Sequence, residues 1–116
     1  MKEPSCIICR IIAGEVPGDI IYKDDSAVAI RDIHPQAPTH LLILPREHLT
    51  SLADTGSEQM PLVTHLVEVA WKLAKKEGVA QKGYRVIINS GPDGDQAVPH
   101  IHLHLLAGRH LSGQMG

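Results

Sequence analysis

The fold of this chain is decided by residues 100–106, which read His-Ile-His-Leu-His-Leu-Leu. Side chains of a β-strand alternate between the two faces of its sheet. This alternation predicts a strand over 98–106 that carries His100, His102 and His104 on one face and aliphatic side chains on the other. Successive imidazoles would lie about 6.6 Å apart along that strand, close enough to act together on one phosphate-sized group.

Imidazoles grouped in this way suit chemistry at phosphorus. A neutral imidazole can attack phosphorus when its other nitrogen donates to a fixed acceptor, and a second imidazole can bind an anionic oxygen or protonate a leaving group. The loop before the strand carries Asn89, Gly91 and Gly94, and glycines let backbone N–H groups approach a phosphate closely. An ordinary turn has the same composition, so the loop is informative only together with the histidines.

Hydrophobic patterning outside this stretch predicts four more strands and two helices. The strands are expected over 20–23, 27–31, 40–45 and 84–89. The helices are expected over 5–13 and 57–76. No repeat or linker divides the chain, so a single domain covering 1–116 is expected. The fold class is therefore α+β: an antiparallel sheet of about five strands with one long helix and a short N-terminal helix.

Composition excludes several functional classes. Eleven Lys and Arg against thirteen Asp and Glu leave a formal charge of −2, which argues against a polybasic nucleic-acid binder and against an acidic tail. The chain has no Phe and only 3% aromatic residues, so base-stacking platforms are nearly absent and no nucleic-acid partner is expected. Eight histidines are far more than an average chain of this length carries, which indicates site chemistry.

The N-terminal region shows no targeting signal, and it holds a cysteine pair. No stretch approaches the roughly 18 to 20 apolar residues that span a bilayer, and no secretory signal is visible, so we expect a soluble cytoplasmic protein without a membrane partner. Cys6 and Cys9 have the C-x2-C spacing. In a chain without an export signal this spacing favours a metal or redox pair over a structural disulfide, and buried free thiols are a further possibility.

The motif at 100–106 resembles the one that names the histidine triad (HIT) superfamily. Residues 31–40, Arg-Asp-Ile-His-Pro-Gln-Ala-Pro-Thr-His, are similar to the family segment Asp-Ile-x-Pro-x-Ala-Pro-x-His. Residues 44–48 (Leu-Pro-Arg-Glu-His) and 106–109 (Leu-Ala-Gly-Arg) also match, so the resemblance covers nearly the whole chain. The Leu-x-Gly-Arg ending is closer to the Hint branch, the nucleoside phosphoramidate hydrolases, than to the other branches.

The resemblance implies catalytic roles for four histidines. His102, the middle histidine of the motif, would attack the α-phosphorus and carry the nucleotidyl group. His104 and His40 would line the phosphate site and help to manage the proton. His100 would orient the strand or serve a metal. On this interpretation catalysis requires no cofactor.

The resemblance also implies a nucleotide site for a purine nucleoside monophosphate or phosphoramidate. Asp32 would accept hydrogen bonds from the ribose hydroxyls. An aliphatic slot would hold the base, formed by Val16, Ile30 and Ile33. Phosphate oxygens would be held by His102 and His104, and by Asn89, Asp95, Gln96 and Ala97, partly through backbone N–H groups.

Some relatives of this kind hold a zinc ion and form dimers. The matching ligands here are Cys6, Cys9, His48 and His100. Such a zinc would be structural, because four protein ligands close its coordination shell. The resemblance further implies a homodimer across which the sheet continues. Trp71, on the predicted long helix, would serve packing or the dimer contact.

Residues 95–97 depart from the family pattern. The family usually has Gly-Gln-Ser/Thr where this chain has Asp-Gln-Ala. Ala97 lacks the hydroxyl donor near the leaving group, and Asp95 adds a negative charge beside an anionic substrate. We therefore expect weaker substrate binding or slower chemistry than is usual for the family.

The sequence favours a hydrolase that cleaves purine nucleoside 5′-phosphoramidates, or aminoacyl-adenylates, to the nucleoside monophosphate through nucleotidyl-His102. Three alternatives stay open. A dinucleoside-polyphosphate hydrolase would use the same histidine with another leaving group. A nucleotide-binding or scaffolding module with little turnover would fit the changes at Asp95 and Ala97. A catalytic metal on the histidine strand would make activity sensitive to a chelator.

Overall fold

The computed structural model describes residues 5–114. Two α-helices, five β-strands and two short 3-10 turns follow one another along the chain. In order they are α1 (Ile7–Ile12), β1 (Ile20–Lys23), β2 (Ala27–Arg31), β3 (Thr39–Pro45), a 3-10 turn (Ser57–Gln59), α2 (Met60–Lys76), β4 (Tyr84–Ile88), a 3-10 turn (Pro92–Gly94) and β5 (Leu103–Ala107). The predicted α+β class is confirmed, with five strands, one long helix and one short helix. Within the described residues, no helix combines the length and the hydrophobicity needed to cross a membrane.

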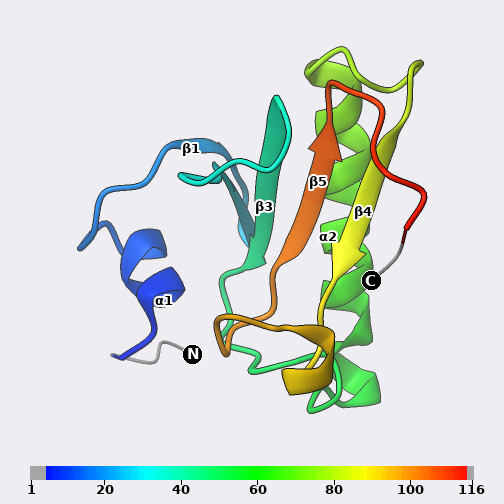
Figure 1. The fold of residues 1–116 in the computed structure, drawn as a ribbon. Helices are drawn as coiled ribbons and strands as arrows, with labels where there is room; N and C mark the ends of the chain where they lie inside the picture. The colour runs from blue at the N-terminus through cyan, green and yellow to red at the C-terminus, as the bar shows by residue number, and fades with distance from the viewer. Residues whose placement is uncertain (1–4, 115–116) are drawn as a thin grey trace.

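The five strands form one antiparallel sheet in the order β1-β2-β3-β5-β4. The last strand in the sequence, β5, inserts between β3 and β4, where Leu103 pairs with Ile43 on one side and Ile88 on the other (Figure 1). This arrangement leaves β1 and β4 as the edge strands. The histidine-bearing end of the chain therefore lies in the interior of the sheet.

The long helix α2 covers one face of the sheet (Figure 1). Pro61 occupies its first turn, where a missing N–H costs nothing, and Lys75 and Lys76 lie in its last turn, where cations suit the helix dipole. Its buried side is apolar: Val63, Leu66, Val69, Ala70, Leu73 and Ala74. These side chains pack against the residues of β3 and β5 that point away from the histidines, including Leu41, Ile43, Leu103 and Leu105. The main core is thus aliphatic, as the absence of Phe requires.

A second, smaller core lies on the opposite face, under α1. It consists of Cys6, Ile8 and Cys9 from the α1 region with Val28, Ile30 and Leu44 from β2 and β3. Alternation along β2 explains how one strand serves both cores, because Ala27 and Ala29 contact the α2 side while Val28 and Ile30 contact the α1 side.

The turn between β1 and β2 is built around Asp24. Its Oδ1 accepts hydrogen bonds from the Ser26 and Ala27 backbone N–H groups (2.8 and 2.7 Å). Its Oδ2 accepts from the Tyr22 hydroxyl and lies 2.7 Å from His65 Nε2 on α2. Burial alone would raise the pKa of Asp24, but these hydrogen bonds outweigh burial and hold the pKa well below its usual range. One carboxylate therefore ties the hairpin to the long helix.

The predicted strand over 98–106 is wrong in its first half. Strand β5 begins only at Leu103. Ile101 still packs on the α2 side with Leu103 and Leu105, and His102 still lies beside His104, so the predicted alternation fails only at His100. The neighbouring strand β3 ends at Pro45, which has no N–H, and the Pro45 carbonyl accepts a hydrogen bond from His100 Nε2 (2.9 Å). Leu103 pairs with Ile88, the last residue of β4, and before it Ile101 leaves the β3 ladder and donates its N–H to the Leu49 carbonyl (2.7 Å). His100 then faces Cys6 and Cys9 instead of His102 and His104.

Candidate active site and metal site

His40 and His104 lie on the sheet face opposite α2. His40 is near the start of β3 and His104 is in β5, and because His104 pairs with Leu42, the two histidines are diagonal neighbours across the strands. His102 precedes β5 directly. The ring centroids of His102 and His104 are 5.1 Å apart, and those of His40 and His104 are 5.2 Å apart. The structure thus brings together three of the four histidines to which catalytic roles were assigned.

The orientation of His102 leaves one ring nitrogen free. Its Nδ1 lies 2.8 Å from the carbonyl oxygen of His100. A carbonyl oxygen only accepts, so in the neutral ring Nδ1 carries the proton and Nε2 carries the lone pair. No buried side-chain nitrogen or oxygen of the described residues lacks a partner, so Nε2, which has none, reaches the surface although His102 is only 7% exposed. An oriented imidazole with a free, accessible Nε2 is the geometry of a nucleophile.

The protonated nitrogen of His40 and of His104 is fixed by a backbone amide. Gln36 N–H donates to His40 Nδ1 (3.0 Å), so the proton of neutral His40 lies on Nε2. His40 Nε2 is 2.9 Å from His104 Nδ1, which therefore accepts and leaves the His104 proton on Nε2. Burial lowers the pKa of both histidines, that of His104 to about 4. Both imidazoles are neutral near pH 7, and His104 presents an N–H donor.

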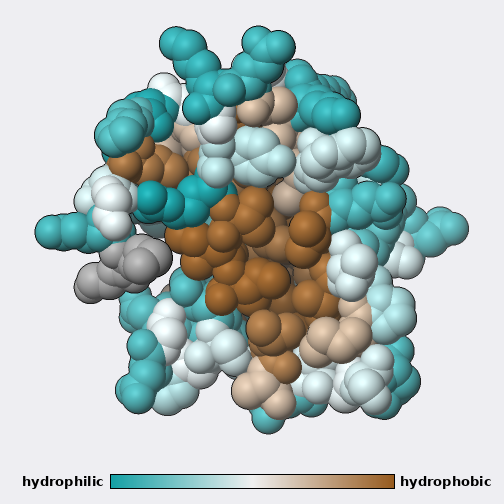
Figure 2. All heavy atoms as spheres, turned by 90° about the vertical axis from the view of Figure 1, so that its right-hand side faces the viewer, coloured by the Kyte–Doolittle hydropathy of each residue, from teal (hydrophilic) through white to brown (hydrophobic). Residues whose placement is uncertain are grey.

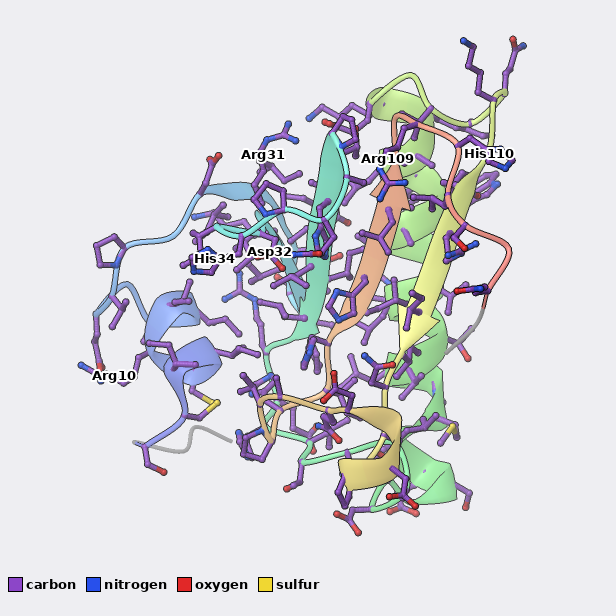
Figure 3. The ribbon with its side chains drawn as sticks, in the orientation of Figure 1. Arg10, Arg31, Asp32, His34, Arg109 and His110 are labelled. Atoms are coloured by element: carbon purple, nitrogen blue, oxygen red, sulfur yellow. The ribbon has the colours of Figure 1, made fainter. Side chains whose placement is uncertain are left out.

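The predicted nucleoside residues lie at the end of β2 and in the loop that follows. Asp32 Oδ1 accepts from the His34 backbone N–H (2.8 Å), and Oδ2 lies 3.4 Å from His40 Nε2. Figure 3 shows Asp32 beside the start of β3. Ile33 is 82% exposed, which is unusual for an isoleucine and suits contact with a ligand. Ile30, by contrast, is only 5% exposed and belongs to the second core, while Val16 is half-buried.

The loop between β4 and β5 is held together by Gln96. Its side chain accepts from Gly91 N–H (2.9 Å) and donates to the carbonyls of Thr50 and Val98, and its own backbone N–H donates to the Gly91 carbonyl. Gln96 therefore shapes the loop and has no donor left for a phosphate. The Ala97 N–H has no acceptor among residues 5–114 and is free for an anion.

Asp95 and Asn89 complete this loop. Asp95 has φ 60°, the left-handed region that favours glycine, which gives a physical reason for the glycine expected at this position. The Asp95 side chain is exposed. Asn89 directly follows β4, and its side chain makes no hydrogen bond to the described part of the chain.

His100, the first histidine of the motif, belongs to a separate cluster with Cys6, Cys9 and His48. One donor atom of each residue lies within 4.8 Å of the others. His100 Nδ1 is 3.4 Å from Cys6 Sγ and 3.5 Å from Cys9 Sγ. His48 Nδ1 is 3.3 Å from Cys9 Sγ and 3.1 Å from His100 Nδ1. Tetrahedral zinc with thiolate and imidazole ligands requires ligand separations of about 3.3 to 3.8 Å, the longest between the two sulfurs.

The hydrogen bonds of this cluster also suit a cation. His100 Nε2 donates to the Pro45 carbonyl, so the Nδ1 that faces both sulfurs carries a lone pair. Burial lowers the pKa of His100 to about 4, which keeps it neutral. Burial raises the pKa of the Cys6 thiol, so a cation is needed to favour the thiolate there. The Cys2His2 donor set therefore fits a zinc ion.

A second group with metal-ligating side chains, Asp32, His40 and His104, does not fit a metal equally well. The Gln36 N–H occupies His40 Nδ1, which obliges Nε2 to carry a proton. A protonated Nε2 is a donor and cannot ligate a metal. The geometry therefore favours an N–H···N pair over the catalytic metal that the sequence left open.

The two cavities described here are not lined by His40, His102 or His104. A cavity of about 510 Å³ lies at the far end of β5, lined by Gly78, Val79, Lys82, Gly83, Gly108, Arg109 and His110. A second, of about 290 Å³, lies behind the β4–β5 loop, where Gln96 and Pro99 contribute to its lining. The candidate site is identified by the chemistry of its side chains.

Three features of the site carry no sequence signal beyond the motif. They are the backbone groups that set the histidine protons: the His100 carbonyl, the Pro45 carbonyl and the Gln36 N–H. The prolines around Gln36 indicate irregular backbone, but they do not show that the Gln36 N–H donates a hydrogen bond to His40. Sequence spacing likewise could not show that the His100 side chain lies beside the two cysteines and apart from His102 and His104.

Comparison with known proteins agrees with this geometry. A family model described as "HIT domain" matches residues 13–111. The chain is 47% identical over 105 residues to a purine nucleoside phosphoramidase of Escherichia coli, covering 90% of this chain and 88% of that protein. It is 46% identical over 118 residues to a 14 kDa zinc-binding protein of Zea mays, covering 100% and 91% of the two chains.

Solved structures show the same similarity. A histidine triad protein from Clostridium difficile superimposes with a TM-score of 0.96 at 43% identity, covering 99% of this chain and 100% of that one. A zinc-bound histidine triad family protein from Mycobacterium smegmatis superimposes with a TM-score of 0.81 at 33% identity, covering 91% and 76%.

Proposed function

The chain belongs to the histidine triad (HIT) family of hydrolases, and on that premise we propose that it hydrolyses purine nucleoside 5′-phosphoramidates or aminoacyl-adenylates to the nucleoside monophosphate. The reaction proceeds through a covalent bond between phosphorus and Nε2 of His102. The observation that carries this proposal is the hydrogen bond from His102 Nδ1 to the His100 carbonyl, which directs the lone pair of Nε2 outward.

The proposed reaction has two displacements at phosphorus. In the first, His102 Nε2 forms a bond to phosphorus while the bond from phosphorus to the leaving group breaks. The positive charge that develops on the His102 ring is stabilised by the His100 carbonyl at Nδ1. In the second, water attacks phosphorus, the P–Nε2 bond breaks and His102 returns to its neutral form.

The other side chains bind and orient the substrate. His104 Nε2–H donates to a phosphoryl oxygen, since its Nδ1 is held as an acceptor by His40. The Ala97 N–H and Asn89 hold further phosphate oxygens, and Asp32 accepts from the ribose. Ala97 offers no hydroxyl to the leaving group, so an amine leaving group takes its proton from water, and the second displacement returns one proton to water.

The cysteine–histidine cluster supports a structural zinc ion held by Cys6, Cys9, His48 and His100. With four protein ligands the ion supplies a crosslink and no open coordination position. It would join α1 to the segment after β3 and to the motif. Because His100 is a ligand and its carbonyl holds His102, the zinc site also orients the nucleophile indirectly.

An exposed apolar face supports a homodimer. Figure 2 views the molecule from the side of β4 and α2 and shows a continuous hydrophobic area there. Exposed large apolar residues of these two elements are Met60, Val67, Trp71, Tyr84 and Val86. Strand β4 is an edge strand, so a second copy of the chain could both cover this face and continue the sheet.

The experiment that tests the function compares two substrates with different leaving groups, and then compares the wild type with a variant at His102. We expect the wild type to hydrolyse an adenosine 5′-phosphoramidate faster than a diadenosine polyphosphate at equal concentration. His102→Ala should lose at least about 10³-fold in kcat, whereas His110→Ala, which changes an exposed histidine outside the cluster, should leave the rate unchanged. Binding of AMP without turnover by the wild type would instead support the binding-module alternative.

A further inference from the structure

Arg109 connects the end of β5 to the loop that precedes β3. Its guanidinium donates from one nitrogen to the Gln36 carbonyl (2.9 Å) and from the other to the His110 carbonyl (3.1 Å). Figure 3 shows Arg109 at the C-terminal end of β5. No carboxylate pairs with Arg109 among residues 5–114. Its hydrogen bonds thus go to two backbone carbonyls, one in the loop before β3 and one in its own segment.

The loop that Arg109 contacts also contains the backbone amide that donates a hydrogen bond to His40. Gln36 lies between Pro35 and Pro38, and its N–H donates to His40 Nδ1 (3.0 Å). Gly108 packs closely against the same segment, because a Cβ at position 108 would lie 2.8 Å from Pro38 Cβ. The Gly108–Arg109 pair therefore fixes this loop by a close backbone approach and by a hydrogen bond.

The fixed amide determines the protons of two histidines in succession. With Nδ1 of His40 accepting from Gln36, the His40 proton must lie on Nε2 and point at His104 Nδ1, 2.9 Å away. His104 then accepts at Nδ1 and carries its own proton on Nε2. If Gln36 moved away, His40 could protonate at Nδ1 and His104 could reverse, which would turn its donor away from the substrate.

We propose that Arg109 is a positioning residue that, through Gln36 and His40, holds His104 in the neutral form with its proton on Nε2. The catalytic consequence rests on the proposed function, but the proton positions do not. The two-pronged contact requires a planar guanidinium, since lysine offers a single point of donation and cannot hold both carbonyls in the same geometry. His104 is thereby a hydrogen-bond donor to the phosphoryl group and not a source of protons.

The direct test is nitrogen-15 NMR of histidine-labelled protein, in which long-range proton–nitrogen correlations distinguish Nδ1-protonated from Nε2-protonated rings. In the wild type we expect His40 and His104 to be protonated at Nε2 and His102 at Nδ1. In Arg109→Ala we expect His40 and His104 to show a mixture of both forms, with His102 unchanged. Arg109→Lys should give an intermediate result and serves as the second variant if Arg109→Ala does not fold.

Kinetics provide the second readout. Arg109→Ala should lower kcat about tenfold or more, with a smaller change in KM. This loss is smaller than the roughly 10²- to 10³-fold loss in kcat that follows removal of a whole oxyanion donor, because His104 would still donate in part of the molecules. Arg109→Ala should add no further loss in a His104→Ala background, because its effect passes through His104. Arg85→Ala is the matched control: its guanidinium also donates to a backbone carbonyl, that of Ser112, but it does not touch the histidines.

The outcomes separate this proposal from the proposed function. If His40 and His104 stay protonated at Nε2 in Arg109→Ala, the positioning role is wrong, whatever the activity. An additive loss in the His104→Ala background would also overturn it. If the proton positions change as expected but the wild type does not hydrolyse phosphoramidates, the positioning role stands and the proposed function fails.

Discussion

At the scale of single residues, backbone atoms decide what each histidine can do. The His100 carbonyl makes His102 a lone-pair donor at Nε2, and the Gln36 N–H makes His104 an N–H donor. The same side chain, histidine, can serve as a nucleophile, a hydrogen-bond donor or a metal ligand according to its hydrogen-bond partner. The motif therefore identifies the residues, and the backbone around it assigns their roles.

A substitution at position 97 tests, at this scale, whether the missing hydroxyl of Ala97 slows the reaction. Ala97→Ser should raise kcat/KM for a phosphoramidate by several-fold to about tenfold, because a hydroxyl donor would assist the leaving group. The gain should be smaller for a substrate whose leaving group needs no proton. Steady-state kinetics on two such substrates measure it. Equal rates for Ala97→Ser and the wild type on both would show that the missing hydroxyl is not limiting.

At the scale of elements, the agreement between sequence and structure depends on whether local patterning or tertiary contacts set the boundary. The strands over 20–23 and 27–31 match the observed bounds, because an alternating or apolar run ends there at a turn with strong local preferences. The long helix was expected from 57, where the chain instead makes a 3-10 turn before α2. Strand β5 was expected from 98 but begins at Leu103, opposite Ile88 at the end of β4, and no local pattern encodes this tertiary pairing.

The attachment of the β1–β2 turn to α2 makes stability dependent on pH. Because the pKa of folded Asp24 lies below its unfolded value of about 4, its ionised form stabilises the fold at neutral pH, and this contribution is lost as the pH falls below about 4. Asp24→Asn should lower the free energy of unfolding at pH 7 by about 1–3 kcal/mol. It should also flatten the acid side of the stability profile, measured by denaturant unfolding from pH 7 to 3. A constant difference between variant and wild type across that range would contradict this role.

The attachment of α1 should depend on the metal. We expect purified protein to contain about one zinc per chain, and a strong chelator to lower Tm by about 10 °C or more, because four ligands from three segments are released. Cys9→Ser should show a reduced metal content and a low Tm that the chelator no longer changes. Elemental analysis and thermal unfolding measure both. Metal-free protein with a Tm unaffected by chelator would mean that the cluster is held by hydrogen bonds alone.

At the scale of the whole molecule, the order of the strands places the histidine cluster and the proposed dimer contact on different surfaces. Inserting β5 between β3 and β4 puts His104 in the middle of the sheet, on the face that α2 does not cover. The same order leaves β4 at an edge, beside the exposed apolar side of α2 (Figure 2). A second copy could bind there without covering the nucleophile.

The proposed assembly has a direct test at this scale. A dimer should sediment at twice the chain mass of 12.6 kDa. Val67→Glu, on the exposed side of α2, should shift the protein to monomers, because a buried unpaired charge opposes association. Ile7→Lys is the matched control, since Ile7 is similarly exposed (42%) but lies on α1. Wild-type protein that sediments as a monomer at micromolar concentration would contradict the assembly.

The central claim is that His102 Nε2 forms a covalent bond to phosphorus, and trapping that bond tests it most directly. Wild-type enzyme mixed with excess adenosine 5′-phosphoramidate and quenched within one turnover should gain the mass of one adenylyl group, and peptide mapping should locate it on His102. His102→Ala should carry no adduct, while His110→Ala should carry the wild-type amount. Hydrolysis by the wild type with no adduct at any quench time, or an adduct on another histidine, would contradict the account.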